Sequence, residues 1–264
     1  MDASVAVQAG MRLVGSGARK VIVVHGWMAG SALFEPLHEH LDIERFTYAF
    51  MDCRGYGERQ QAPGPYSVEQ IAEDMLALAD ALEWPVFSVL GHSMAGMAAQ
   101  WLMVSVPQRL ERVVLLATVP ASGAVLSTER RTLLGEAMHD PNARRALISA
   151  NVGRRRPRSW LDTLLALSLD TASPQAMQAY LESWAGDGFA ERMQGVSVPT
   201  LVLVGEHDPG STVAGMNATV MAWLTDARLT VLEDVGHYPM CEAPAMLARA
   251  IEAWILPGSK PQVA

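Results

Sequence analysis

The sequence of 264 residues contains only two cysteines, Cys53 and Cys241, which are too few for a disulfide framework and lack the spacing of a metal site. Its seven histidines form neither an H-E-x-x-H motif nor a paired Cys/His arrangement. Positive charge is also scarce, since the formal net charge is -8 and phosphate contacts need a basic face. We therefore expect no metal, no cofactor and no nucleic-acid partner.

Long hydrophobic runs are missing as well. The longest, such as VIVV at 21–24 and VVLLA at 113–117, are far shorter than a membrane span. The N-terminal segment has no charged region followed by an apolar core, so a secretory signal is not expected. These observations predict a cytoplasmic protein without a membrane partner. They leave its oligomeric state open.

The composition is that of an ordered globular protein. Half of the residues are hydrophobic and 18% are charged, and the length allows one large α/β domain or two small ones. One basic run, Arg154 to Arg158, departs from the acidic balance. We interpret it as a solvated loop or helix end, with a patch for a phosphate or an acidic ligand as the alternative.

Short apolar runs alternate with segments of helical periodicity along most of the chain. Strands are expected at 20–25, 46–52, 86–91, 112–119, 200–205 and 228–233, with a weaker strand or pair within 3–14. Ser67 and Gln70 form a capping box at the start of one helix. The alternation predicts an α/β protein with a mostly parallel central sheet, covered by helices on both faces.

The alternation is interrupted once, between Ala121 and Val196, where only helical signals occur. Asp140-Pro141 and Ser173-Pro174 each have the pattern of an N-cap residue followed by a first-turn proline. We expect residues 121–196 to form a helical cap inserted after the sixth strand. Residues 1–120 and 197–264 would then form the core.

The stretch VLGHSMAGM at 89–97 places Ser93 between an expected strand and an expected helix. A sharp turn there would expose the serine hydroxyl and bring the Met94 amide to the helix N-terminus, where the helix dipole favours an oxyanion. The nucleophile motif G-x-S-x-G has glycine where this chain has Ala95, and Gly96 follows. By itself the stretch fits a nucleophile and a turn serine equally.

Two later strand ends supply the partners that a serine nucleophile needs. Asp208 lies in GEHDPG and His237 in EDVGHYP, so the chain order is Ser, Asp, His. Upstream, His25-Gly26 ends a strand, which makes the Trp27 amide a candidate second oxyanion donor.

Several other polar residues near these motifs have a structural interpretation. We expect His92 to point away from the site, His25 to support its loop, and Asp52 to order the loop that follows it. His207, His38, His40 and His139 are the remaining competitors of His237, and Asp234 is the alternative to Asp208. We interpret Asp234 as a solvated loop residue.

Together the motifs HGW (25–27), DCRGYGE (52–58), GHSMAG (91–96), GEHD (205–208) and GHYPMCEAP (236–244) resemble those of the α/β-hydrolase superfamily. The resemblance covers nearly the whole chain except the cap. It implies Ser93 as nucleophile, His237 as base, Asp208 as its orienting acid, and the Trp27 and Met94 amides as oxyanion donors. Ala95 and Arg59 depart from the usual pattern, the latter in a loop where relatives often carry serine.

Within that superfamily, a serine nucleophile argues against haloalkane dehalogenases and epoxide hydrolases, which use aspartate. The resemblance implies a carboxylesterase-like enzyme that cleaves a small or medium apolar ester, or a lactone, through an acyl-enzyme. A carbon–carbon bond hydrolase, a perhydrolase or cofactor-free haloperoxidase, and a ligand-binding receptor remain alternatives.

The remaining candidates near the site have two interpretations each. Trp160 and Trp184 line a pocket or attach the cap to the core. Met28, Met94 and Met240 are interpreted as core filling in preference to an adaptable substrate wall, and Cys241 as an inert buried residue.

Overall fold

The central sheet has seven strands in the order β1-β3-β2-β4-β5-β6-β7 in a computed structural model, which describes residues 10–186 and 188–256. β1 is antiparallel to β3, and all the other pairs are parallel. The strands are β1 (Met11–Val14), β2 (Arg19–Val24), β3 (Phe46–Met51), β4 (Phe87–His92), β5 (Leu110–Leu116), β6 (Thr200–Gly205) and β7 (Ala227–Leu232). The predicted mostly parallel sheet is confirmed. β1 lies within the expected 3–14 segment, and residues 3–9 of that segment are outside the described residues.

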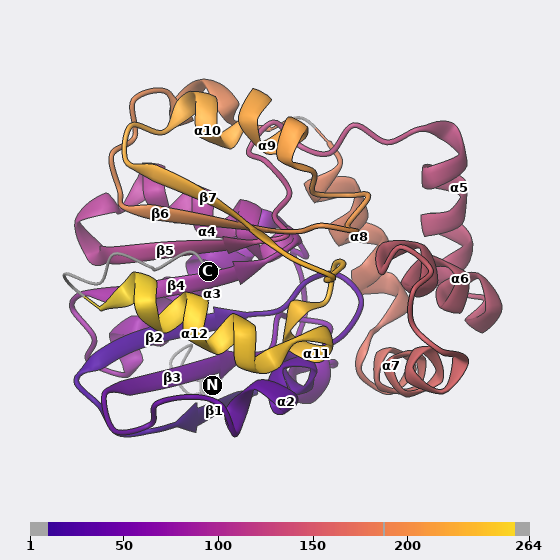
Figure 1. The fold of residues 1–264 in the computed structure, drawn as a ribbon, viewed down its shortest axis with the longest axis horizontal. Coiled ribbons are helices and arrows are strands. Elements are labelled where there is room, and N and C mark those ends of the chain that lie inside the picture. The colour runs from indigo at the N-terminus through magenta and orange to yellow at the C-terminus, as the bar shows by residue number, and fades with distance from the viewer. Residues whose placement is uncertain (1–9, 187, 257–264) are drawn as a thin grey trace.

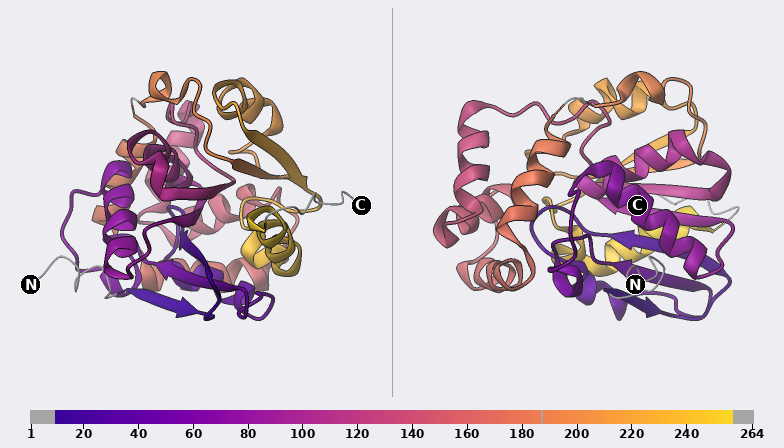
Figure 2. Two further views of the ribbon diagram at one scale, coloured as in Figure 1. Left: turned by 90° about the vertical axis from the view of Figure 1, so that its left-hand side faces the viewer. Right: turned by 180° about the vertical axis from the view of Figure 1, so that it is seen from behind.

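Helices cover both faces of this sheet, as predicted. α3 (Val68–Ala81) and α4 (Met94–Ser105) lie on one face, and α12 (Pro244–Ile255) lies on the other (Figures 1 and 2). The Ser67 hydroxyl accepts a hydrogen bond from the Gln70 amide and so caps α3. Strands β3, β4 and β6 are buried along their whole length, which explains their continuous apolar sequence.

Four longer helices come between β5 and β6 and lie beyond one end of the sheet (Figure 1). They are α5 (Thr128–Ala137), α6 (Pro141–Asn151), α7 (Arg158–Thr171) and α8 (Pro174–Trp184). The Asp140 carboxylate caps α6 and the Ser173 hydroxyl caps α8, as the Asp-Pro and Ser-Pro pairs predict. This segment follows β5, the fifth described strand, whereas it was predicted to follow a sixth strand. That prediction counted a pair of strands within 3–14, and residues 3–9 lie outside the described residues.

The remaining elements are short helical turns. They are too short to produce a hydrophobic periodicity that could be recognised in the sequence. They are η1 (Ser31–Phe34), α2 (Glu35–His38), η2 (Gly57–Arg59), η3 (Pro107–Arg109), η4 (Ala190–Met193), α9 (Val213–Ala218), α10 (Val220–Trp223) and α11 (Pro239–Glu242). In the part of the chain that the structure describes, no helix has the length and apolar character needed to cross a membrane.

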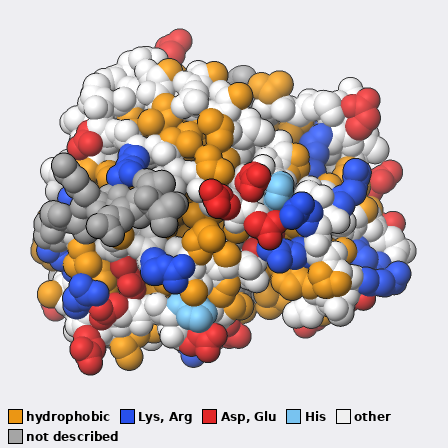
Figure 3. Space-filling view, viewed as in Figure 1, with side chains coloured by type: hydrophobic (Ala, Val, Ile, Leu, Met, Phe, Trp, Pro, Cys, Tyr) orange, Lys and Arg blue, Asp and Glu red, His pale blue; other side chains and the backbone are white. Residues whose placement is uncertain are grey.

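The basic run Arg154 to Arg158 spans the loop between α6 and α7 and the first residue of α7, and its predicted surface position is confirmed. Two of its charges have partners in the C-terminal part of the chain: Arg155 pairs with Asp234 in the loop after β7, and the Arg156 Nε lies 3.2 Å from a carboxylate oxygen of Glu242 at the end of α11. Figure 3 shows basic and acidic side chains side by side on this face. The run thus connects the α5–α8 segment to the loop after β7 and to α11 by ion pairs.

Candidate functional site

Ser93 occupies a sharp turn between β4 and α4. Its backbone dihedrals are φ 56° and ψ −116°, a region that non-glycine residues enter at a cost of roughly 1–3 kcal/mol. The turn is held by backbone hydrogen bonds: the Ser93 amide donates to the Leu116 carbonyl at 2.9 Å, and its own carbonyl accepts from Gly96 and Val119 at 2.9 and 3.1 Å. The surrounding backbone therefore fixes a strained residue whose hydroxyl projects from the end of β4.

Two glycines make this turn possible. A Cβ atom on Gly91 would lie 2.4 Å from the Ala95 carbonyl oxygen, and one on Gly96 would lie 2.2 Å from the Thr118 hydroxyl. Ala95 itself is fully buried. The turn therefore accommodates a methyl group at position 95, whereas position 96 has no room for one. The departure from G-x-S-x-G leaves the turn intact.

Replacing Gly96 with alanine is expected to destabilise the fold by about 1–3 kcal/mol, because the added methyl group overpacks the contact with Thr118. Gly135 in α5 is the matched control, since a Cβ there meets nothing within 4 Å. Gly135→Ala is expected to stabilise the protein by about 0.5–1 kcal/mol through helix propensity. Urea unfolding of both variants measures the difference. Equal stability of Gly96→Ala and the unchanged protein would contradict this steric account.

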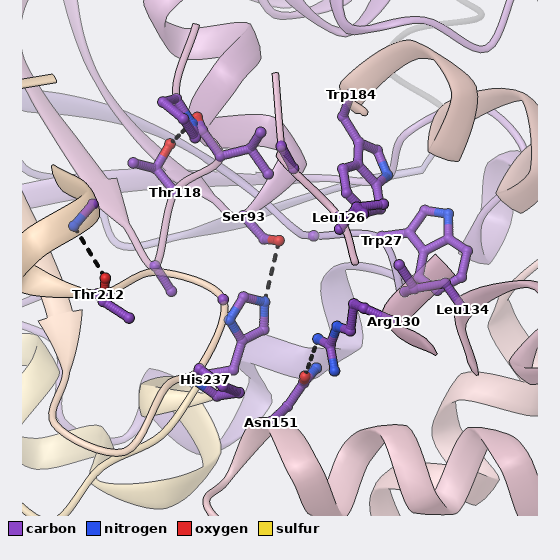
Figure 4. Close-up of a pocket in the computed structure, with 18 of the residues that line it drawn as sticks. Trp27, Ser93, Thr118, Leu126, Arg130, Leu134, Asn151, Trp184, Thr212 and His237 are labelled. Carbon is purple, nitrogen blue, oxygen red and sulfur yellow. Dashed lines mark hydrogen bonds between the residues drawn. The ribbon is translucent and has the colours of Figure 1, made fainter. Parts of the chain in front are cut away.

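The structure brings the three predicted triad residues together at the ends of their strands. The His237 Nε2 lies 3.1 Å from the Ser93 Oγ (Figure 4). The His237 Nδ1 lies 2.7 Å from the Asp208 Oδ2. The Asp208 side chain is fully buried, and its second oxygen accepts a hydrogen bond from the Gly210 amide at 2.8 Å. An Nδ1–H that donates to Asp208 leaves the Nε2 lone pair free to accept the serine proton.

The predicted orientation of His92 is wrong, because its side chain packs behind His237 instead of pointing away. The two imidazole rings have centroids 5.0 Å apart, and the His92 Nε2–H donates to the His237 carbonyl at 2.8 Å. Burial, followed by the neighbouring His237, lowers the pKa of His92 well below its ordinary value. His92 is therefore a neutral hydrogen-bond donor that positions the His237 backbone.

The loop after β2 lies directly against Ser93. A Cβ on Gly26 would approach the Ser93 Cβ to 2.8 Å, so only glycine allows this contact. The next residue, Trp27, is held on two sides: its indole donates to the Met177 carbonyl at 2.7 Å, and its carbonyl accepts from the Tyr56 hydroxyl at 2.6 Å. These contacts hold Trp27 in place directly after the glycine that lies against Ser93.

The neighbouring polar residues have the structural functions that were predicted. The His25 Nε2 accepts from the Cys53 amide at 2.9 Å, which joins the ends of β2 and β3. The Asp52 carboxylate accepts from the Ser31 and Glu58 amides at 2.6 and 3.0 Å and so orders two loops.

Two further residues, Arg59 as the other departure from the superfamily's pattern and Asp234 as the alternative acid, lie away from Ser93 and His237. Arg59 is buried and pairs with Asp74 at 2.8 Å. Asp234 has a side chain that is 70% exposed and pairs with Arg155. Neither contacts Ser93 or His237, so neither competes with Asp208.

Above Ser93 lies a cavity of about 500 Å³, bounded by strand-end loops and by the α5–α8 segment (Figure 4). Trp27 and Trp184 face each other edge-to-face with ring centroids 6.1 Å apart. Trp184 and Met28 line the cavity, whereas Trp160 is not among its lining residues and packs instead against the Arg156 guanidinium. The volume and the mainly apolar lining suit a small organic ligand.

Of the other residues named near the site, the two methionines that do not line the cavity are buried as predicted, whereas Cys241 is half-buried and not fully buried. Met94 and Met240 are fully buried in the core. Burial, with the neighbouring Glu242, raises the pKa of the Cys241 thiol to about 12, so that it stays protonated at neutral pH.

Sequence reasoning missed a chain of polar contacts that supports His237. The Asn151 carbonyl accepts from the His237 amide at 2.9 Å, and the Asn151 side-chain amide donates to the Tyr238 hydroxyl at 3.0 Å. The Asn151 side-chain oxygen accepts from Arg130 at 2.5 Å. No motif could have revealed Arg130 or Asn151, because each comes from a helix that has no fixed spacing to the triad.

Glu242 is a second residue without an assigned function in the sequence analysis. Its carboxylate is almost fully buried and accepts from the amides of Gly236 and Tyr238, at 3.1 and 3.0 Å, on either side of His237. The position of Glu242, five residues after His237 within the motif GHYPMCEAP, is the sequence feature that could have indicated this function.

Comparisons with known proteins agree with the fold described above. The family described as "alpha/beta hydrolase fold" matches residues 20–244. The chain is 29% identical over 212 residues to 3-oxoadipate enol-lactonase 2 of Acinetobacter baylyi, covering 80% of this chain and 79% of that one. It is 25% identical to a pimeloyl-[acyl-carrier protein] methyl ester esterase of Nitrosomonas europaea, covering 88% and 94% of the two chains. A solved esterase of Thermogutta terrifontis superposes with a TM-score of 0.79 at 25% identity, over 93% and 92% of the chains. On its family match, its sheet and its helices, the chain belongs to the alpha/beta hydrolase fold family.

Proposed function

We propose that this protein is a serine hydrolase that cleaves a small or medium, mainly apolar carboxylic ester or lactone through an acyl-enzyme on Ser93. The observation that carries the proposal is the continuous contact from Asp208 through His237 to the Ser93 hydroxyl, at 2.7 and 3.1 Å, beneath a cavity of about 500 Å³. The two relatives above, named as an enol-lactonase and a methyl ester esterase, support the same bond type.

In the proposed acylation step, the Ser93 Oγ attacks the ester carbonyl carbon while its proton moves to the His237 Nε2. Asp208 stabilises the imidazolium that forms, since its carboxylate accepts the Nδ1–H. The bond to the leaving alcohol then breaks, and His237 transfers the proton to the alcohol oxygen. For a lactone the leaving oxygen stays attached to the acyl chain.

In the proposed deacylation step, His237 takes a proton from a water molecule that attacks the acyl carbon, and returns it to the Ser93 oxygen as the acid leaves. The amides of Trp27 and Met94 are assigned as donors to the oxyanion of both tetrahedral intermediates. Within the described residues, neither amide has a protein acceptor, which leaves both available for this task.

The division into core and cap belongs to the same proposal. Residues 1–120 and 197–264 form the core that carries the triad, and residues 121–196 form a cap that completes the cavity. Trp184, Arg130 and Asn151 come from this cap and line the cavity. Substrate choice would then depend mainly on the cap.

A panel of p-nitrophenyl esters with acyl chains of increasing length, together with simple lactones, tests the proposal. We expect saturable hydrolysis of the short and medium members and weaker activity on chains too long for the cavity. Absence of hydrolysis across both classes, together with thermal stabilisation by a small ligand, would favour a receptor and contradict the proposal.

A further inference from the structure

The cavity above Ser93 has an unbalanced charge. Among the described residues that line it, Arg130 is the one Lys or Arg, and no Asp or Glu belongs to the lining. The two buried carboxylates nearby are already engaged, Asp208 with His237 and Glu242 with Arg156. A guanidinium carries its positive charge at any physiological pH. The cavity therefore presents one fixed cation to whatever ligand occupies it.

Arg130 also differs from the arginines around it. Arg145 pairs with Asp162 at 2.6 Å, and Arg156 pairs with Glu242 at 3.2 Å. Arg144 is buried, and its guanidinium donates to the carbonyls of Ala137, Met138 and Ser168, which close the ends of the surrounding helices. In the described part of the chain, Arg130 has no carboxylate partner and donates to a single side-chain oxygen, that of Asn151.

The position of Arg130 is nevertheless well defined. Asn151 accepts its hydrogen bond through the side-chain oxygen and donates to the Tyr238 hydroxyl through the side-chain nitrogen. Arg130 is half-buried, and desolvation lowers the pKa of its guanidinium, an effect that the nearby Asp208 carboxylate offsets only in part. Placing a cation where water is partly excluded costs free energy, unless an anion compensates it. A preorganised guanidinium with unused donors has the properties of a carboxylate-binding group.

The same contacts place this group close to the proposed chemistry. The Asn151 carbonyl accepts from the His237 amide, so one residue contacts both Arg130 and the proposed base. Figure 4 shows the Arg130 guanidinium directed toward Asn151 on the side of His237, with Leu134 and Trp27 on its other side. An anion at Arg130 therefore shares the cavity with a carbonyl that Ser93 attacks.

The geometry points to Arg130 as a specificity-determining residue that binds a free carboxylate on the substrate. This inference rests on the proposed function, and it narrows the substrate class to esters or lactones of otherwise apolar acids that carry one additional carboxylate. The apolar part of such a molecule would lie against Trp27, Leu134 and Trp184.

The experiment compares matched substrates: the monoethyl esters of dicarboxylic acids with four to eight carbons, the corresponding neutral half-amides, and the plain ethyl esters of equal length. Acid release is followed chromatographically to obtain kcat/KM. For the best chain length, kcat/KM of the unchanged protein is expected to be about 10- to 100-fold higher for the carboxylate-bearing ester than for either neutral analogue. This is the gain in binding that one charge-assisted hydrogen bond gives. If the unchanged protein hydrolyses the carboxylate-bearing ester no faster than the two neutral analogues, the inference is overturned before any variant is measured.

The variants then assign that preference to one residue. Arg130→Met should remove most of the preference, and Arg130→Lys should keep a part of it because the charge remains. Arg158→Met is the matched control, because this cap arginine has a side chain that is 79% exposed and does not line the cavity. The same preference in Arg130→Met as in the unchanged protein would overturn the inference.

Calorimetric binding to Ser93→Ala separates failure of the inference from failure of the proposed function. If the protein hydrolyses none of these esters, tighter binding of the carboxylate-bearing ester, lost on adding Arg130→Met, would still support the inference. If it hydrolyses charged and neutral esters equally, the proposed function stands and the inference fails.

Discussion

Replacing Ser93 with alanine is expected to lower kcat on p-nitrophenyl esters by about 10⁴- to 10⁶-fold, the range found when a serine nucleophile is removed from a triad. The physical reason is the hydrogen bond between the Ser93 Oγ and the His237 Nε2, at 3.1 Å. Among the described residues, Ser93 has the only hydroxyl group that hydrogen-bonds to the His237 ring. Without it, His237 has no nucleophile to activate, and the remaining rate comes from substrate binding and the oxyanion donors.

Steady-state kinetics of the purified variant, checked by circular dichroism, measure this loss. Ser105→Ala is the control, because Ser105 is exposed at the far end of α4, and its turnover should match that of the unchanged protein. KM should change far less than kcat, since the cavity walls stay intact. A Ser93→Ala variant that retains a tenth of the original kcat would remove Ser93 from the mechanism.

Replacing Asp208 with asparagine is expected to lower kcat by about 10⁴-fold, because it reverses the tautomer of His237. The two oxygens of Asp208 have separate partners: one accepts from the Gly210 amide at 2.8 Å and the other from His237 at 2.7 Å. An asparagine has one oxygen. If that oxygen accepts from Gly210, the side-chain amide nitrogen of the asparagine faces the His237 Nδ1 and donates to it. The Nδ1 must then be unprotonated, so the ring proton lies on Nε2. A protonated Nε2 cannot accept the serine proton.

The matched control is Asp234→Asn, which changes the alternative acid, in the loop after β7. Asp234 is mostly exposed and pairs with Arg155, so its loss should leave kcat within about twofold, in line with the small contribution of surface ion pairs. The pair of variants is measured by kcat/KM on one ester at one pH. Near-full activity of Asp208→Asn, or a large loss in Asp234→Asn, would show that the acid has been misassigned.

The sequence predicted the central part of the sheet well because β3, β4 and β6 are buried along their whole length. The runs at 46–52 and 200–205, for example, became β3 and β6 with bounds that differ by at most one residue. The proximity of Ser93, Asp208 and His237 was also predictable, since residues that follow parallel strands meet at one edge of the sheet.

The residues around Ser93, Asp208 and His237 could not be predicted in the same way, because their positions depend on how segments far apart in the sequence pack together. His92 was expected to point away, but its ring packs against His237 and hydrogen-bonds to the His237 carbonyl, a contact between two distant segments that the sequence does not reveal. Trp160 and Trp184 could not be distinguished, since only the packing of α7 and α8 decides which of them lines the cavity. Arg130 in particular has no neighbour in sequence that marks it as a cavity residue.

The central claim, a covalent acyl-enzyme on Ser93, is tested most directly by mass spectrometry. The protein is mixed with a p-nitrophenyl ester, quenched in acid during the first turnovers and digested, and the same is done with a serine-directed fluorophosphonate. We expect one acyl group, or one phosphonyl group, on the peptide that contains Ser93, and none on that peptide in Ser93→Ala. Full hydrolysis of the ester by a protein that carries neither group on Ser93 would contradict the account.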